Sequence, residues 1–321
     1  MEKQERNEAE NRTITKMAQH WLQNKKMQVK EATYVKYYNI LNNHIMEEFS
    51  DIQCTAVTTN VMEAYIEQKL TSGKRDGRPL AEKTVKDIVS VLKDISAFAL
   101  RHNIEIPCRF DLIKIRVPSS QINILSVKDE QKIKAYLQQS DVEYLCATGI
   151  LLSMYMGLRL GEVCALKKQN ILLDIGVLQV RSTMQRIQDI SPNRIHKTKI
   201  IITEPKSRSS IRDIPIPDFL TQRLKHFHKM TDDTYILTGS PNYYIEPRTL
   251  ENILKKYMRE CGIQEINYHT LRHTFATRCI EAGFDAKTLS EILGHSSVNI
   301  TLNRYVHSSM ERKRKCMMEL C

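Results

Sequence analysis

The chain has 321 residues, of which 41% are hydrophobic and 26% charged, so it has an ordinary globular composition and is long enough for two domains. No apolar run approaches the roughly 20 residues of a membrane-spanning helix, and the polar N-terminus is unlike a signal peptide. We therefore expect a cytoplasmic protein with no membrane partner. The net charge of +11 is consistent with nucleic acid, although a basic solvated surface explains the charge alone equally well. Residues 105–321 carry +9 of it.

The eight cysteines predict neither a disulfide framework nor a metal site. They show no CxxC or other metal-binding spacing, and most lie in apolar sequence, where a reduced cysteine acts as a small hydrophobic residue. Cys316 and Cys321, close to the C-terminus, are the exceptions.

The N-terminal third has the pattern of a helical bundle. Residues 1–12 are polar and are expected to be disordered, whereas residues 13–104 contain four stretches with apolar side chains at helical spacing. These stretches run from Thr13 to Leu22, from Tyr34 to Ile45, from Thr59 to Leu70 and from Val85 to Ala99. With no strand signal among them, they predict a small helical bundle.

A linker and a second, larger domain follow. Residues 105–124 contain two prolines and no sustained period, which predicts an extended linker. Ser126 with Asp129 forms a capping box that opens a domain over 125–307. Its β-rich part, 171–216, predicts a small antiparallel sheet inside an otherwise helical domain.

The segment from His269 to Tyr305 predicts three short helices that carry polar side chains at their ends. His269 and Arg272 stand at i and i+3 on one helical face, and Gly294 ends a second helix directly before His295. Ser297 can cap a third helix, on which Val298, Leu302 and Tyr305 share a face.

Several of these residues also have an ordinary structural interpretation. A tyrosine on an apolar helical face is usually a core residue, a turn lysine such as Lys206 is usually solvated, and Arg159 alone would usually form a surface ion pair. His269 and His273 at i and i+4 suggest zinc, but Thr270 stands where a metalloprotease needs Glu. We therefore expect neither a metal nor a cofactor.

Four sequence boxes in a fixed order resemble the tyrosine recombinases, or phage integrases. They are GLRLGEVCAL at 157–166, TEPKSRSSIRDIPI at 203–216 with its PKxxxSxR spacing, HTLRHT at 269–274, and LGHSS at 293–297 with a tyrosine ten residues after its histidine. The N-terminal bundle is similar to the SAM-like core-binding domain that precedes the catalytic domain of integrases. The resemblance implies a mainly α fold with a small antiparallel sheet in the second domain.

The resemblance also implies the site residues. Arg159 and Arg272 correspond to the two arginines, Tyr305 to the nucleophile, and Glu162 to an acidic residue that supports Arg159. The remaining catalytic positions are His269, His295 and the hairpin lysine, Lys206, with Lys199 and Lys197 as alternatives if the hairpin register differs.

The chemistry of phosphoryl transfer explains this choice of side chains. Two planar guanidiniums can clamp the equatorial oxygens of a phosphodiester, and the histidines can donate to them or take the phenol proton. Lys206 would protonate the 5′-oxygen that leaves. The family reaction gives a 3′-phosphotyrosyl link, which retains the bond energy so that no ATP or metal is required.

We expect a site-specific recombinase that acts as a homo-tetramer on double-stranded DNA attachment sites, with an excisionase or a host DNA-bending protein as further partners. The tail, 308–321, is expected to contact a neighbouring protomer. Only about a dozen residues precede Thr13, so simple sites without arm repeats are expected. An integrase of a mobile element or phage is the first interpretation and a Xer-type dimer resolvase the second. A DNA-binding protein without cleavage activity and a type IB topoisomerase are further alternatives.

Overall fold

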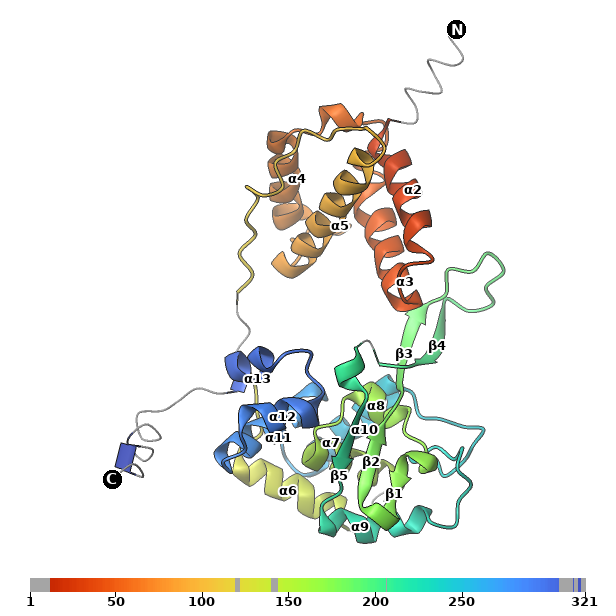
Figure 1. The fold of residues 1–321 in the computed structure, drawn as a ribbon, viewed down its shortest axis with the longest axis vertical. Helices are drawn as coiled ribbons and strands as arrows, with labels where there is room; N and C mark the ends of the chain where they lie inside the picture. Colours follow the sequence, from red (N-terminus) through yellow and green to blue (C-terminus); the bar gives the residue numbers. More distant parts are fainter. Residues whose placement is uncertain are drawn as a thin grey trace. The chain divides into compact units, whose positions relative to one another are not determined.

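The computed structural model describes residues 12–118, 122–139, 144–205, 207–305, 314, 317 and 318. The chain divides into two compact units, one formed mainly by the residues before 121 and the other mainly by those after it (Figure 1). Within the described residues, no helix is long and apolar enough to cross a membrane.

The first unit is a helical bundle, as the sequence predicts. Its helices are α2 (Ile14–Lys25), α3 (Glu31–Ile40) followed by a π-helical turn (Leu41–Ile45), α4 (Thr59–Ser72) and α5 (Glu82–Leu100). Thr13 and Thr58 cap α2 and α4, because each side chain accepts a hydrogen bond from a backbone N–H of the first turn. The apolar faces of the helices meet around Trp21, which is 1% exposed.

Part of the predicted linker belongs to this first core. Ile106 and Cys108 are buried against it, whereas Leu125, at the other end of the same stretch, is buried in the core of the second unit. Residues 104–118 form no helix or strand, and the buried side chains of Ile106 and Cys108 attach this segment to the first core.

The second unit is mainly helical. Its helices are α6 (Val127–Leu137), α7 (Tyr144–Met156), α8 (Leu160–Cys164), α9 (Asp218–Leu224), α10 (Pro247–Glu260), α11 (His269–Glu281), α12 (Ala286–Leu293) and α13 (Val298–Tyr305). Ser126 caps α6 as predicted, since its hydroxyl accepts from the backbone N–H of Asp129 at 3.1 Å. The helix α7 is buried along almost its whole length, so it forms the centre of this core.

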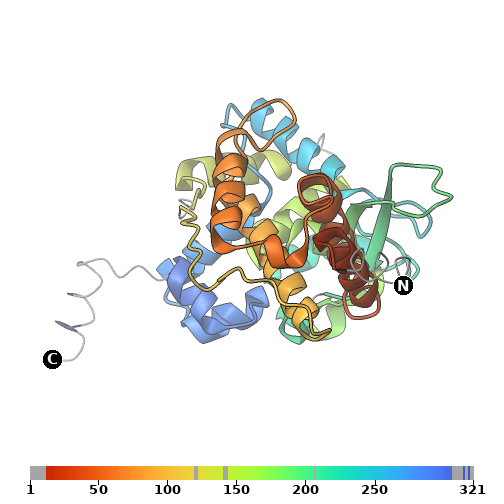
Figure 2. The ribbon, with the colours of Figure 1, turned by 90° about the horizontal axis from the view of Figure 1, so that it is seen from above.

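The β-rich region forms two small antiparallel sheets rather than the single predicted one. One contains β1 (Ile171–Leu172), β2 (Val177–Val180) and β5 (Arg212–Pro215) in the order β1-β2-β5, and the other pairs β3 (Thr183–Gln188) with β4 (Thr198–Thr203). The β3–β4 hairpin stands out from the body of the second unit in both views (Figures 1 and 2). The predicted turn around Lys206 therefore connects two sheets: β4 pairs with β3, and β5 pairs with β2.

The last three helices lie together at one side of the second unit (Figure 1). Asp285 caps α12, and Gly294 ends the helix as predicted, in the left-handed conformation with φ +64°. The predicted buried face of α13 is wrong in one position. Leu302 is exposed, and Thr301 is fully buried beside Tyr305 because i and i+4 face the core here.

Gly157 makes the turn between α7 and α8 possible. Its φ is +64°, and a Cβ at this position would lie 2.6 Å from Phe275 Cδ1 and 2.8 Å from Leu293 Cδ2. Both the backbone conformation and the close approach of α11 and α12 thus require glycine.

We expect Gly157→Ala to lower the free energy of unfolding by about 2–4 kcal/mol, because left-handed strain and overpacking add. Gly262→Ala is the matched control: its φ is +63° but no atom lies within 4 Å of the added Cβ, so only about 1–2 kcal/mol should be lost. Urea unfolding followed by circular dichroism measures both. Equal losses in the two variants would contradict the packing argument.

Candidate active site

Three arginines from different elements converge on the C-terminal end of α12. Arg212 of β5 donates to the carbonyl oxygen of Ile292 at 2.6 Å. Arg272 of α11 donates to that of Leu293 at 2.7 Å, and Arg159, just before α8, to that of Gly294 at 3.1 Å. The last carbonyls of a helix lack intrahelical partners and lie at the negative end of its dipole, so they stabilise guanidinium groups.

The Glu162 carboxylate joins two of these arginines. It is 4% exposed, accepts from Arg159 Nη1 at 2.6 Å and takes two hydrogen bonds from Arg212, at 2.9 and 3.1 Å. It also accepts from the backbone N–H of Arg159 at 2.9 Å. Burial raises the pKa of this carboxyl, but Arg212 and Arg159 outweigh burial and lower the pKa to about 2. Glu162 is therefore ionised and holds Arg159 in place.

Arg272 is the most buried of the three arginines, at 2% exposure. Its Nη1 donates to the Gly157 carbonyl oxygen at 2.8 Å, so carbonyls on both sides fix the guanidinium plane. Burial, followed by the charge of Arg159, lowers its pKa to about 9. A guanidinium has five N–H donors, and two bonds to backbone carbonyls leave others to bind an anion.

His295 follows Gly294 and is held by the next helix. Its Nδ1 lies 2.8 Å from the Thr301 hydroxyl of α13, and its ring stacks on Tyr305 with 6.4 Å between centroids. Burial lowers the pKa of His295 to about 3, with Arg272 and Arg159 adding to the effect. The imidazole is therefore neutral near pH 7 in the protein without DNA.

The first turns of α11 carry two histidines on one face. His269 begins the helix at the surface, and His273, one turn later, packs edge-on against it with 4.8 Å between ring centroids. Partial burial, together with His273 and Arg272, lowers the pKa of His269 to about 4. His273 Nδ1 lies 2.7 Å from the Tyr305 hydroxyl.

Tyr305 ends α13 with its ring buried, at 7% exposure. Burial raises the pKa of its hydroxyl, and the guanidiniums of Arg272, Arg304 and Arg159 act in the opposite direction. The two other tyrosines near the sequence boxes have different surroundings. Tyr268 hydrogen-bonds Ser153 at 2.8 Å inside the core, and Tyr257 packs on Tyr136.

The predicted lysine and the tail fall mostly outside the described residues. Lys206 is not described, and of the segment 308–321 only residues 314, 317 and 318 are. The alternative lysine Lys199 lies on β4 with its Nζ 3.7 Å from Asp189, and Lys197 precedes the same strand. The structure thus brings together Arg159, Glu162, His269, Arg272, His295 and Tyr305, and leaves the place of Lys206 as a prediction.

The sequence analysis missed several residues of this site. Arg212 and Ser210 are the last two fixed positions of the PKxxxSxR spacing, and Ser210 donates to the Gly294 carbonyl oxygen at 3.3 Å. The motif itself was therefore the signal, although the analysis used only its lysine. Thr301 had no comparable signal, because its partner His295 lies on another element, whereas His273 stands inside the HTLRHT box and was considered only as a possible metal ligand.

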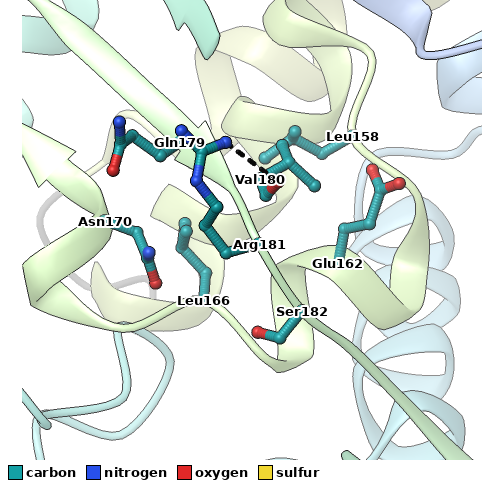
Figure 3. A pocket seen from close by; sticks show the side chains of 8 residues that line it. All are labelled: Leu158, Glu162, Leu166, Asn170, Gln179, Val180, Arg181 and Ser182. Atoms are coloured by element: carbon teal, nitrogen blue, oxygen red, sulfur yellow. Dashed lines mark hydrogen bonds between the residues drawn. The ribbon is translucent and has the colours of Figure 1, made fainter. Parts of the chain in front are cut away.

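A shallow hollow lies next to Glu162 (Figure 3). Its open space is about 200 Å³, and its lining includes Asn170, Arg181 and Ser182. Arg181 donates to the backbone oxygens of Val180 at 3.3 Å and of Arg212 at 3.0 Å, so it braces β5. Glu162 is the one predicted site residue in this lining.

Sequence comparison finds a matching protein family for each of the two units. Residues 123–312 match the phage integrase family, and residues 13–70 match the N-terminal SAM-like domain of phage integrases. The chain is 28% identical to a tyrosine recombinase XerC-like protein of Caldanaerobacter subterraneus over 320 residues, which covers 92% of this chain and 79% of that protein. It is 24% identical to a putative prophage phiRv2 integrase of Mycobacterium tuberculosis, covering 93% of this chain and 75% of the relative.

Solved structures share the fold. The Tn1549 transposon integrase in complex with transposon right end DNA superposes with a TM-score of 0.77 at 21% identity, covering 96% of this chain and 99% of that one. A lambda integrase dimer bound to a COC′ core site gives a TM-score of 0.63 at 17% identity, covering 91% and 96%.

The chain belongs to the phage integrase family, the class of the tyrosine recombinases. The predicted mainly α fold with a SAM-like first domain is confirmed. The enzyme carries out DNA cleavage and strand transfer in site-specific recombination.

We expect Glu162→Gln to lose about 3 kcal/mol of stability at pH 7, since a buried carboxylate with a depressed pKa is replaced by a neutral amide. The folded pKa lies below the unfolded value of 4.5, so this contribution is complete above pH 4.5 and disappears as the pH falls towards 2. Urea unfolding at pH 7 and pH 3 should therefore show a smaller difference between variant and wild type at the lower pH.

Glu246→Gln serves as the control for this experiment. Glu246 pairs with Arg186 at the surface, where an ion pair contributes less than about 1 kcal/mol. A loss at Glu162 no larger than that at Glu246, or one independent of pH, would contradict the role given to the buried carboxylate.

Proposed function

We propose that Tyr305 is the nucleophile that attacks a DNA phosphate and forms a 3′-phosphotyrosyl link with release of a 5′-hydroxyl. The observation that carries the proposal is the surroundings of the Tyr305 hydroxyl. Arg272 and Arg159 act on it electrostatically, and the His295 ring stacks against its own. Positive charge around a phenol both attracts the phosphate and stabilises the phenolate.

Arg159 and Arg272 form the phosphate clamp in this proposal. Their terminal nitrogens are anchored on consecutive carbonyls, those of Gly294 and Leu293, so the two guanidiniums are held beside each other. The negative charge that develops on the equatorial oxygens would be bound by N–H groups already in place. Such preorganised donors stabilise a transition state without reorganisation.

The histidines and the lysine have the remaining roles. A neutral His295 whose Nδ1 accepts from Thr301 presents Nε2–H as a donor to a phosphate oxygen, and His269 at the edge of the site can do the same. Lys206 is proposed to protonate the 5′-oxygen that leaves. The covalent link preserves the phosphate bond energy, so a 5′-hydroxyl of another duplex can reverse the step without ATP, and the guanidiniums neutralise charge as a metal would.

The substrate we propose is a pair of double-stranded DNA attachment sites bound by a homo-tetramer, with an excisionase or a host DNA-bending protein as accessory partner. The +9 carried by residues 105–321 supports a polyanionic ligand. The similar folds of the Tn1549 integrase, solved with transposon right end DNA, and of the lambda integrase dimer on a core site support duplex DNA as this ligand.

Within this class we propose an integrase of a mobile element or phage. The prophage integrase among the relatives and the transposon integrase among the similar folds support it. The 28% identity to a XerC-like recombinase favours dimer resolution as the second candidate.

Tyr305→Phe should abolish covalent capture of DNA while leaving DNA affinity unchanged, because only the attacking oxygen is removed. A core site is first selected from a library of random duplexes by gel shift. A nicked form of that duplex then traps the link, which denaturing electrophoresis shows as protein joined to DNA.

Tyr268→Phe is the matched control and should still form the covalent band, because the Tyr268 hydroxyl hydrogen-bonds Ser153 inside the core. A full-strength band from the Tyr305 variant would falsify the assignment of the nucleophile.

Arg272→Lys should reduce the rate of cleavage on the order of 10²–10³-fold although the charge is kept. An ammonium group cannot replace a planar guanidinium that two backbone carbonyls hold in a fixed orientation. The rate of covalent complex formation with the same nicked duplex measures this. Arg186→Lys, on the β3 surface, is the control and should cleave at the wild-type rate. Near-normal cleavage by the Arg272 variant would remove this residue from the proposed clamp.

A further inference from the structure

The Tyr305 hydroxyl has a hydrogen-bond partner that the roles above leave unused. His273 Nδ1 lies 2.7 Å from it, which is a short, well-formed hydrogen bond. The ring centroids are 5.7 Å apart with the planes at 49°, so the histidine approaches the hydroxyl through its nitrogen and not through its face.

The two histidines with assigned roles are engaged differently. His295 uses Nδ1 for Thr301 and lies parallel to the tyrosine ring, with 7° between the planes. A stacked ring presents its π face to the phenol. His269 packs edge-on against His273. Of these two rings, it is His273 that hydrogen-bonds the Tyr305 hydroxyl.

We propose that His273 is a further catalytic residue, the base that takes the proton of Tyr305 when the phenol attacks; this inference rests on the function proposed above. A base must lie within hydrogen-bond reach of the proton that it removes, and among the described histidines the 2.7 Å contact gives His273 this position.

The proton and electron balance of the step is complete. The Tyr305 oxygen forms a bond to phosphorus as its proton passes to His273 Nδ1, and the bond from phosphorus to the 5′-oxygen breaks. That oxygen takes a proton from the acid assigned to Lys206. In the reverse step a 5′-hydroxyl attacks the phosphorus and gives its proton back to Lys206, the bond from phosphorus to Tyr305 breaks, and His273 returns its proton to the Tyr305 oxygen.

The surroundings of His273 keep it ready to accept a proton. Burial lowers the pKa of its imidazole, and the neighbouring cations Arg304 of α13 and Arg272 of α11 lower it further. His269 and Tyr305 are the other titratable groups in contact with the ring. The imidazole is thus neutral near pH 7, and with the proton on Nε2 its Nδ1 is an acceptor.

The test compares His273→Gln and His273→Asn with wild type on a nicked duplex whose scissile phosphate carries a 5′-bridging sulfur. A thiolate leaves without protonation, so this substrate isolates the base from the acid. At pH 7 both variants should form the covalent link about 10²-fold or more slowly than wild type. The matched control His228→Asn, at an exposed histidine of the same unit, should react at the wild-type rate.

The pH profile separates proton transfer from positioning. Wild type should be level between pH 7 and 9, because His273 is already neutral, whereas the variants should rise about tenfold per pH unit as hydroxide replaces the base. Asn places an oxygen near the Nδ1 position, so a level profile or a restored rate in His273→Asn would reduce the histidine to a positioning group and overturn the proposal.

The same experiment distinguishes this inference from the proposed function. A covalent product from Tyr305→Phe means that the nucleophile is wrong. An inactive Tyr305→Phe together with wild-type rates in both His273 variants means that only the base is wrong. Thermal unfolding and gel-shift affinity of the variants, expected to match wild type, show that a slow rate is not lost folding or binding.

Discussion

The C-terminal end of α12 is the point on which the site depends. Three successive carbonyls, those of Ile292, Leu293 and Gly294, each accept a hydrogen bond from a different arginine. These carbonyls have no partner within the helix, so binding guanidiniums satisfies groups that otherwise would need water. Because the three arginines come from β5, α11 and α8, one helix end fixes elements that are far apart in the sequence. The left-handed Gly294 then turns the chain so that His295 follows at the same place.

The charges around this helix end do not cancel. Glu162 supplies one negative charge against the three guanidiniums of Arg159, Arg212 and Arg272. Burial lowers the pKa values of His269 and His295 and the excess positive charge lowers them further, whereas for Tyr305 the positive charge acts against the increase in pKa that burial causes. Under the proposed function, the positive charge that would attract a phosphodiester is thus the same charge that favours the phenolate of Tyr305.

The arginines also differ in their exposure and in the groups to which they donate. Arg212 is buried and donates to groups inside the protein, namely the Glu162 carboxylate and the backbone carbonyl oxygens of Ser210 and Ile292. Arg159 has 32% of its side chain exposed and shares the same carboxylate. Burying an ion pair has an unfavourable desolvation free energy. Here the Arg212–Glu162 pair fixes the position of Arg159, which shares the carboxylate. The Glu162 carboxylate thus connects the buried Arg212 to the partly exposed Arg159.

The sequence alone determined the helical first domain, the mainly α second domain and the residues of the boxes, because helical periodicity, caps and glycines act over a few residues. The cap at Ser126 and the helix end at Gly294 were predicted and found on these grounds. The tertiary structure decided the contacts between residues far apart in the sequence, which helical periodicity, caps and glycines do not predict. Strand pairing is non-local, so β5 joined β2 and the single predicted sheet became two. The contact of His273 with Tyr305 joins residues 32 positions apart, and that of Arg212 with Glu162 joins residues 50 apart. Such partners are chosen by the packing of whole helices, and for this reason spacing within one segment could not reveal them.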